Sequence, residues 1–132
     1  MSEAIANDEE RGGLELPEIP LFPLRTVLFP EGVLPLRIFE PRYVDMIRWC
    51  MRNQVNFGVV LLRTGSDVTD KDADAVPDVF RIGTEAKIVD FNQADNGLLG
   101  IVAQGARKFS IKESYLQKDG LLKATVEFAK EE

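Results

Sequence analysis

Proline is concentrated in one apolar part of this chain. Five of the seven prolines fall within residues 19–43, which read IPLFPLRTVLFPEGVLPLRIFEPRY and include three phenylalanines. Such apolar content predicts burial, but a proline lacks the backbone N–H that an interior strand donates. A strand with a proline therefore belongs at a sheet edge or breaks its pairing there. The segment excludes a long regular helix and predicts short strands at free edges.

Three pieces follow from this reading. Residues 19–24 form a proline-containing strand, and residues 25–32 form a connection that ends in the turn Pro30-Glu31-Gly32. Residues 33–39 form a second strand. Because side chains alternate along a strand, its inward face is formed by Leu34, Leu36 and Ile38. We expect Leu36 and Ile38 to be core residues.

One helix is predicted directly after these strands. Pro41 suits the first helical position, where the missing N–H has no partner in any case, and Glu40 precedes it with a charge that favours the helix dipole. Apolar residues recur at helical spacing up to about residue 53. We expect residues 19–39 to wrap around the domain and to pack on this helix through Val44 and Ile47.

The remainder reads as strands and turns. Strands are expected over 57–63, 79–91 (with a bend or bulge at Gly83), 98–103, around 109–111 and over 121–128. Asp95-Asn96-Gly97 predicts a hairpin with a type I′ turn, and Lys118-Asp119-Gly120 predicts a second hairpin. Six or seven strands and one helix predict a mainly β fold, a curled and mostly antiparallel sheet or barrel.

The length and the charge distribution of the chain predict one domain that is preceded by an acidic tail. The chain has 132 residues and a net charge of −6, and the tail accounts for most of that charge. We predict a disordered acidic tail over 1–16 and a nearly neutral domain over 17–129. Near-neutrality disfavours nucleic-acid binding, which normally needs a basic stripe. No apolar stretch is long enough to span a membrane, and a single cysteine, Cys50, favours the cytoplasm.

Residue types that carry catalysis are scarce. The chain has no histidine, which removes the Ser-His and Cys-His nucleophile pairs. Cys50 is expected to be a small buried apolar residue. Asp70, Asp72 and Asp74 have the spacing of a calcium loop, but Ala75 and Arg81 replace its glycine and its glutamate. We therefore predict no catalytic residue, no metal and no cofactor, and a mobile acidic loop over 64–78.

The order of several short motifs resembles a known family. The motifs are Pro20-Leu21-Phe22-Pro23-Leu24, Leu28-Phe29-Pro30, Leu34-Pro35-Leu36, Ile38-Phe39-Glu40-Pro41-Arg42-Tyr43, Phe57-Gly58, Ile82-Gly83-Thr84 and Gly105-Ala106-Arg107-Lys108-Phe109. Over about residues 17–129 they resemble the N-terminal, substrate-binding domain of Lon proteases. The sequences of the first motifs are more similar to those of free-standing bacterial Lon-domain proteins than to those of the proteases. The resemblance implies a PUA-like pseudo-barrel with one helix. The ATPase and serine-lysine protease domains of Lon are absent from this sequence, so no enzyme activity is expected.

The resemblance directs the functional hypotheses. The first is a non-catalytic module that binds unfolded or degradation-prone polypeptide through an exposed strand edge or an apolar groove. Its candidate contacts are Phe22, Arg25, Phe29 and Arg42, with Phe29 as a surface anchor. In the competing interpretation both phenylalanines are core, and Arg42 pairs with Glu40 or Glu31. Two other functions stay open: RNA binding, by analogy with PUA-like folds, and weak homo-oligomerisation.

Overall fold

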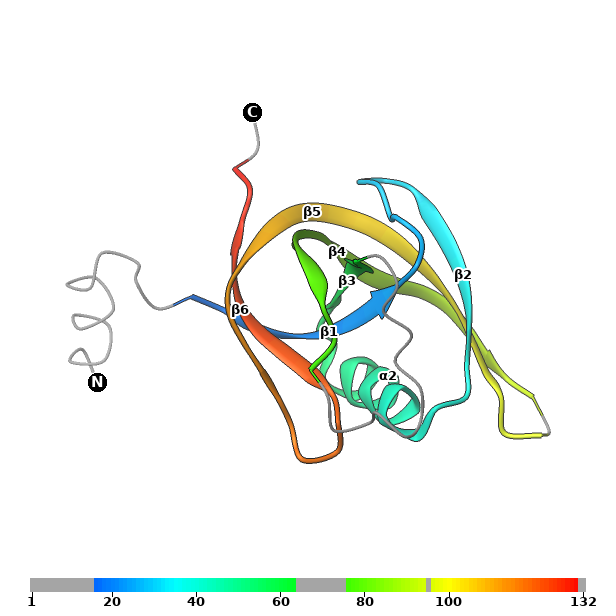
Figure 1. Cartoon of the computed structure of the whole chain (residues 1–132). Coiled ribbons are helices and arrows are strands. Elements are labelled where there is room, and N and C mark those ends of the chain that lie inside the picture. Colours follow the sequence, from blue (N-terminus) through cyan, green and yellow to red (C-terminus); the bar gives the residue numbers. More distant parts are fainter. Residues whose placement is uncertain (1–15, 64–75, 95, 131–132) are drawn as a thin grey trace, which may run out of the picture.

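The sheet closes on itself around two apolar clusters. The computed structural model describes residues 16–63, 76–94 and 96–130. Its elements are β1 (Glu18–Leu24), β2 (Val33–Ile38), α2 (Pro41–Asn53), β3 (Phe57–Leu62), β4 (Val79–Gln93), β5 (Leu99–Leu116) and β6 (Leu122–Phe128). The strand order is β2-β5-β4-β3-β1-β6, and β5 also pairs with β6. Figure 1 shows β5 arching over the other strands, with α2 beside β1 and the lower end of β2. Within the described residues, the expected mainly β barrel with one helix is confirmed.

Two expectations concern segments that lie largely outside the described residues. These are the acidic tail over 1–16, of which only Leu16 is described, and the acidic loop over 64–78, of which only 76–78 are described. Their disorder and mobility, and the absence of calcium from the loop, stay predictions.

The helix begins at Pro41 and ends at Asn53, as the sequence predicts. Glu40 is extended before it, and Gln54 ends it in the left-handed conformation, with its N–H donating to the Cys50 carbonyl. Its buried residues are Tyr43, Met46, Ile47 and Cys50, and Val44 packs partly buried against the same cluster. That cluster joins the helix to side chains of the strands, among them Phe22, Ile38 and Phe57. The proline-rich segment thus packs on α2 through Ile47, with Val44 at the margin.

A second cluster fills the other half of the barrel. It contains Leu21, Val60, Phe109, Ile111, Leu122, Ala124 and Val126. The three members from β6 alternate along the strand with half-buried Lys123 and Thr125, so the predicted period-two pattern is confirmed. Together the two clusters hold β1 rigidly, because Leu21 lies in one and Phe22 lies in the other.

Strand β1 changes partner within its length. Its first part, Glu18–Pro20, pairs antiparallel with β6, and its second part, Leu21–Leu24, pairs parallel with β3. The two registers do not overlap, so within the described part of the chain each half of β1 pairs on one side only. The expected break in pairing therefore occurs directly after Pro20. This arrangement lets an apolar strand with two prolines lie in the middle of the sheet order.

Pro35 and Pro23 lie at strand edges that pair with no other strand among the described residues. The Gly105 N–H donates to the Gly32 carbonyl at 2.9 Å, and hydrogen-bonded positions alternate along an antiparallel pair. In β2 the backbone of Pro35 therefore faces away from β5. The Val126 N–H donates to the Pro17 carbonyl, and the same alternation places Pro23 of β1 on the side that β6 has left. Each proline removes an N–H that another chain could pair with, which protects the edge from aggregation.

Both predicted hairpins are present, with a different turn. The Ala94 N–H donates to the Leu98 carbonyl and the Gln117 N–H donates to the Leu121 carbonyl, so each loop has three residues. Gly97 and Gly120 close the loops at φ near +90°, a conformation that glycine adopts without strain. The expected two-residue type I′ turn at Asn96-Gly97 is wrong, because the flanking pair is Ala94 and Leu98, which leaves three residues in the loop. Three-residue loops that end in a left-handed glycine are the next most common hairpins.

Glu85 of β4 makes stability depend on pH. Its carboxylate is buried and accepts hydrogen bonds from Arg107 at 2.9 Å and Asn56 at 3.0 Å. Burial alone would raise the pKa of Glu85, but these two partners outweigh it and lower the pKa below its ordinary value near 4.5. The contribution to stability is therefore present above that value and is lost as the pH falls through the lowered pKa.

We expect Glu85→Gln to lower the urea midpoint at pH 7 and to reduce the loss of stability on acidification below pH 4.5. The matched control is Glu113→Gln, at an exposed position of β5, which should follow the wild-type profile. Equal pH profiles for Glu85→Gln and the wild type would contradict this role.

Candidate functional site

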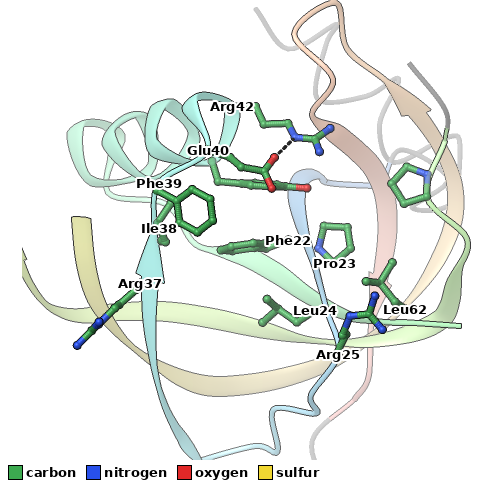
Figure 2. Close-up of a pocket in the computed structure, with 12 residues that line it drawn as sticks. Phe22, Pro23, Leu24, Arg25, Arg37, Ile38, Phe39, Glu40, Arg42 and Leu62 are labelled. Atoms are coloured by element: carbon green, nitrogen blue, oxygen red, sulfur yellow. Dashed lines mark hydrogen bonds and ion pairs between the residues drawn. The ribbon is translucent and has the colours of Figure 1, made fainter. Parts of the chain in front are cut away.

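A groove lies between β1, the end of β2 and the start of α2. We call it the β1–β2 groove; it encloses about 430 Å³ and is lined by residues 22–25, 37–40, Arg42, Tyr43, Leu62 and Pro77. Figure 2 shows Phe22 and Leu24 between the two strands, with Phe39 and Glu40 above them. Three of the four candidate residues, Phe22, Arg25 and Arg42, line this groove.

An aromatic stack forms the floor of the groove. The ring of Phe22 stacks on that of Tyr43 with centroids 4.3 Å apart and planes at 16°, and Phe57 lies tilted below at 6.2 Å. Phe22 is only 8% exposed. Most of its surface is therefore buried, as the competing interpretation of Phe22 as a core residue predicts. Burial, the largest cause, raises the pKa of Tyr43, so its hydroxyl stays protonated at neutral pH. The floor is therefore rigid and uncharged.

Arg42 is held by the protein itself. Its Nε donates to Glu40 at 3.0 Å and its Nη1 donates to the Gly120 carbonyl at 2.8 Å, and the side chain is 11% exposed. The guanidinium also lies 5.0 Å from the centre of the Tyr43 ring. The sequence left two partners open for Arg42, Glu40 and Glu31, and the structure shows the pair with Glu40. Arg42 ties the start of α2 to the β5–β6 hairpin and keeps the groove in shape.

Phe39 is the groove residue that sequence reasoning missed. It lies directly before the helix, and its side chain is 70% exposed although it borders the buried Ile38 and the Phe22 floor. A signal was present in the sequence. If Ile38 faces the core, the next residue of an extended segment faces outward, so a large apolar side chain at position 39 has to meet solvent.

Phe29 is exposed but lies apart from this groove. Its side chain is 65% exposed, and it does not line the β1–β2 groove. The surrounding connection is fixed to β5, because the Glu31 N–H donates to the Gly105 carbonyl at 2.8 Å and the Gly32 N–H donates to the Phe29 carbonyl. The structure thus separates Phe29 from the other three candidates. The role of Phe29 as a surface anchor is untested, and it is an alternative to a binding site at the groove.

A second apolar hollow competes with the groove as a binding surface. It encloses about 290 Å³ between the 25–32 connection, β3 and β4, and its exposed apolar residues include Val27, Phe80 and Ile82. Arg63 lies with its guanidinium 5.0 Å from the Phe80 ring centre, which covers part of this surface. The hollow lacks an aromatic stack at its base, which distinguishes it from the groove.

Cys50 and Lys112, two side chains that could take part in nucleophilic chemistry, are buried and ion-paired respectively. Burial raises the pKa of the Cys50 thiol to about 12, so the thiolate needed for nucleophilic attack does not form at neutral pH. Lys112, which follows Ser110 at the next position on the same strand face, pairs with Glu127 at 3.2 Å. Within residues 16–63, 76–94 and 96–130, no three acidic or cysteine side chains come close enough to hold a metal ion. No helix among these residues has the length and apolarity to cross a membrane.

Comparison with known proteins gives a consistent result. A family model for the ATP-dependent protease La (LON) substrate-binding domain matches residues 18–132. The Lon protease of Flavobacterium johnsoniae is 32% identical over 81% of this chain, and that of Brevibacillus choshinensis is 31% identical over 93%. The chain spans only 13% and 15% of the length of these two relatives.

Solved structures agree with the sequence relatives. A Lon N-terminal domain protein from Xanthomonas campestris superposes with a TM-score of 0.73 at 35% identity, over 87% of this chain and 61% of that one. The N-terminal domain of a Mycobacterium avium complex Lon protease shares the fold, with a TM-score of 0.58 at 16% identity over 88% of this chain and 56% of that one. The chain therefore belongs to the family of Lon protease N-terminal, substrate-binding domains.

Proposed function

We propose that this domain is a non-catalytic module that holds apolar segments of unfolded polypeptide in the β1–β2 groove. The observation that carries the proposal is the exposed ring of Phe39 beside the rigid Phe22–Tyr43 floor. Solvent-exposed aromatic side chains next to an apolar depression are typical of binding surfaces. The family's description as a substrate-binding domain of an ATP-dependent protease supports the same function.

Side chains, not an added strand, supply the binding energy in this proposal. An incoming strand would need regular backbone donors along the edge it pairs with. Pro23 and Pro35 remove such donors from the two strands that border the groove, as the pairing registers imply. A volume of about 430 Å³ has room for a few large side chains, so recognition depends on apolar content rather than on one fixed sequence.

Among the described residues that line it, the groove has no group that would cleave a peptide bond. Its titratable side chains are three arginines, Tyr43 and Glu40, and Glu40 is paired with Arg42. An activated nucleophile or a metal-bound water is needed for hydrolysis. This supports binding without catalysis, and the buried free thiol of Cys50 fits a reducing compartment such as the cytoplasm.

The proposal predicts a contrast between two exposed phenylalanines. Phe39→Ala should weaken binding of a fluorescein-labelled unstructured peptide with a central Phe-Leu-Phe by about tenfold, which is the loss of roughly 1.4 kcal/mol of apolar contact. Phe29→Ala removes the same ring from an equally exposed position outside the groove and should leave the affinity unchanged. Fluorescence anisotropy measures both, and thermal melts should show that both variants fold.

If instead Phe29→Ala weakens binding and Phe39→Ala has no effect, the binding site lies at the 25–32 connection and not at the groove. A domain that binds single-stranded RNA but no apolar peptide would support the RNA-binding alternative and overturn the proposal. Oligomerisation stays a separate prediction, which light scattering on the same samples tests.

A further inference from the structure

A pocket that the proposed function does not use lies between α2 and the β5–β6 hairpin, which are neighbours in Figure 1. We call it the helix pocket; it encloses about 440 Å³. Its apolar part is formed by the buried Met46 and Leu121 and by Trp49, whose side chain is 41% exposed. The ammonium group of Lys123 lies 5.5 Å from the centre of the Trp49 ring. An apolar base with an aromatic side chain and a few charged groups is typical of a ligand site.

Two arginines of α2 give the helix pocket positive charge. Arg48 and Arg52 lie one turn apart on the same face of the helix, and neither has an ion-pair partner within the described part of the chain. Two aspartates also line the pocket, but Asp119 accepts hydrogen bonds from its own hairpin. Asp45 is then the one acid left beside the two arginines among the described lining residues. The two guanidinium groups are therefore only partly compensated, and each can bind a carboxylate.

The acidic tail of the same chain has the complementary charge. Residues 1–15 contain five acidic residues and one arginine, and three of the acids are consecutive, Asp8-Glu9-Glu10. The tail joins β1 at the rim of the pocket, because Glu18 pairs with Lys123 at 3.7 Å and Lys123 lines the pocket. A ligand of opposite charge is thus attached to the protein next to the two arginines.

The length of the tail suits a contact with the helix pocket. The seven residues between the acidic run and Glu18 reach up to about 25 Å when extended, whereas Arg48 and Arg52 are about 6 Å apart along the helix axis. Gly12-Gly13 lies within this connection and allows the chain to reverse its direction. Because a tethered segment acts at an effective concentration in the millimolar range, a few exposed ion pairs are sufficient to hold it.

We propose that the acidic run Asp8–Glu10 binds in the helix pocket of its own chain, with its carboxylates at Arg48 and Arg52. The bound tail covers Trp49 and closes the pocket, so that another acidic ligand has to displace it. The predicted disorder over 1–16 then applies only outside the bound run. This inference concerns a different surface from the β1–β2 groove, and it holds or fails independently of the proposed function.

Trp49 reports directly on the contact, because it is the only tryptophan of the chain. Acrylamide quenching of its fluorescence should be weaker in NaCl at about 50 mM than at about 500 mM, because salt screens exposed charges and releases the tail. The triple variant Asp8→Asn, Glu9→Gln, Glu10→Gln should be quenched at low salt as strongly as the wild type is at high salt. The ratio of bound to free tail should fall by about two- to fivefold for each ion pair removed. Equal quenching of the triple variant and the wild type at low salt would overturn the inference.

A double-mutant cycle locates the partner of the tail. Arg48→Gln with Arg52→Gln should also increase the quenching at low salt, and combining this pair with the triple tail variant should add nothing further, because both remove the same contact. Additive effects would mean that the tail and the arginines act separately, and would overturn the inference. Lys87→Gln removes a positive charge at an exposed position of β4 outside the helix pocket and should leave the quenching of Trp49 unchanged. Thermal melts check that all variants fold.

Dilution distinguishes the chain's own tail from that of a second copy. An intramolecular contact gives the same quenching of Trp49 at every protein concentration, so tenfold dilution should have no effect on the wild type. Quenching that increases on dilution would mean that the tail binds a second copy, and the intramolecular contact would be overturned.

Discussion

Phe57→Ala should lower the free energy of unfolding by about 3–5 kcal/mol, the usual cost of removing a buried phenylalanine. Phe57 is fully buried at the start of β3, in the cluster that joins the sheet to α2. Its ring supports Phe22, which stacks on Tyr43, so the cavity opens directly under the groove floor. Single domains are stable by only about 5–15 kcal/mol, and the variant therefore loses a large part of its stability.

Phe29→Ala is the matched control for this prediction. It removes the same ring from a side chain that is 65% exposed, and it should change the free energy of unfolding by less than about 0.5 kcal/mol. Urea denaturation followed by tryptophan fluorescence of Trp49 measures both variants. If Phe29→Ala destabilises the domain as strongly as Phe57→Ala, the 25–32 connection is part of the core and the account of this segment is wrong.

Gly105→Ala should be almost as damaging, for a steric reason. A Cβ atom at Gly105 of β5 would overlap the carbonyl oxygen of Phe29 and lie 2.9 Å from its carbonyl carbon, and both belong to the backbone. The substitution would push the connection away and strain the bonds that Gly105 makes to Glu31 and Gly32. Overpacking costs about 1–3 kcal/mol and each lost hydrogen bond about 1 kcal/mol. We expect a total loss of about 2–4 kcal/mol.

Gly100→Ala provides the control in the same strand. The nearest atom to its added Cβ is the Oδ1 of Asn92 at 3.0 Å, the end of an exposed and flexible side chain that can move aside. The free energy of unfolding should therefore change by less than about 1 kcal/mol. Thermal melts of the two alanine variants compare them directly, and equal melting temperatures would show that the contact between Phe29 and Gly105 does not fix the connection.

Local signals in the sequence were sufficient for most of the elements. The exception is β5, which is one continuous strand over Leu99–Leu116 where the sequence analysis expected two, over 98–103 and around 109–111. Pro41 and the helical spacing of apolar residues give α2 its observed bounds, and the alternation in β6 identifies its buried face. Leu36 is a partial exception. It faces inward as expected but is only half-buried against the first cluster, because β2 lies at the edge of the sheet. We therefore expect Leu36→Ala to cost less than the 2–5 kcal/mol of a fully buried leucine.

Long-range pairing could not be predicted in the same way. Nothing within residues 18–24 specifies that the strand leaves β6 after Pro20 and continues parallel to β3, because that depends on segments more than 35 residues away. The groove has the same origin, since it brings together the ends of β1 and β2, the start of α2, and Leu62 and Pro77. The sequence predicted Phe22, Arg25 and Arg42 as contact residues, and all three line the groove. It could not show that Phe39 lies at the groove and Phe29 does not, because that depends on which residues surround each side chain in the fold.

The position of a bound polypeptide tests the central claim most directly. We suggest titrating the ¹⁵N-labelled full chain with the unlabelled Phe-Leu-Phe peptide and following the backbone amide signals by NMR. Binding in the groove predicts that the changes centre on the amides of Leu24, Arg25, Phe39, Glu40, Arg42 and Tyr43, while those of Phe80 and Ile82 at the second hollow stay unchanged. Changes centred on Phe80 and Ile82, with the groove signals unmoved, would contradict it.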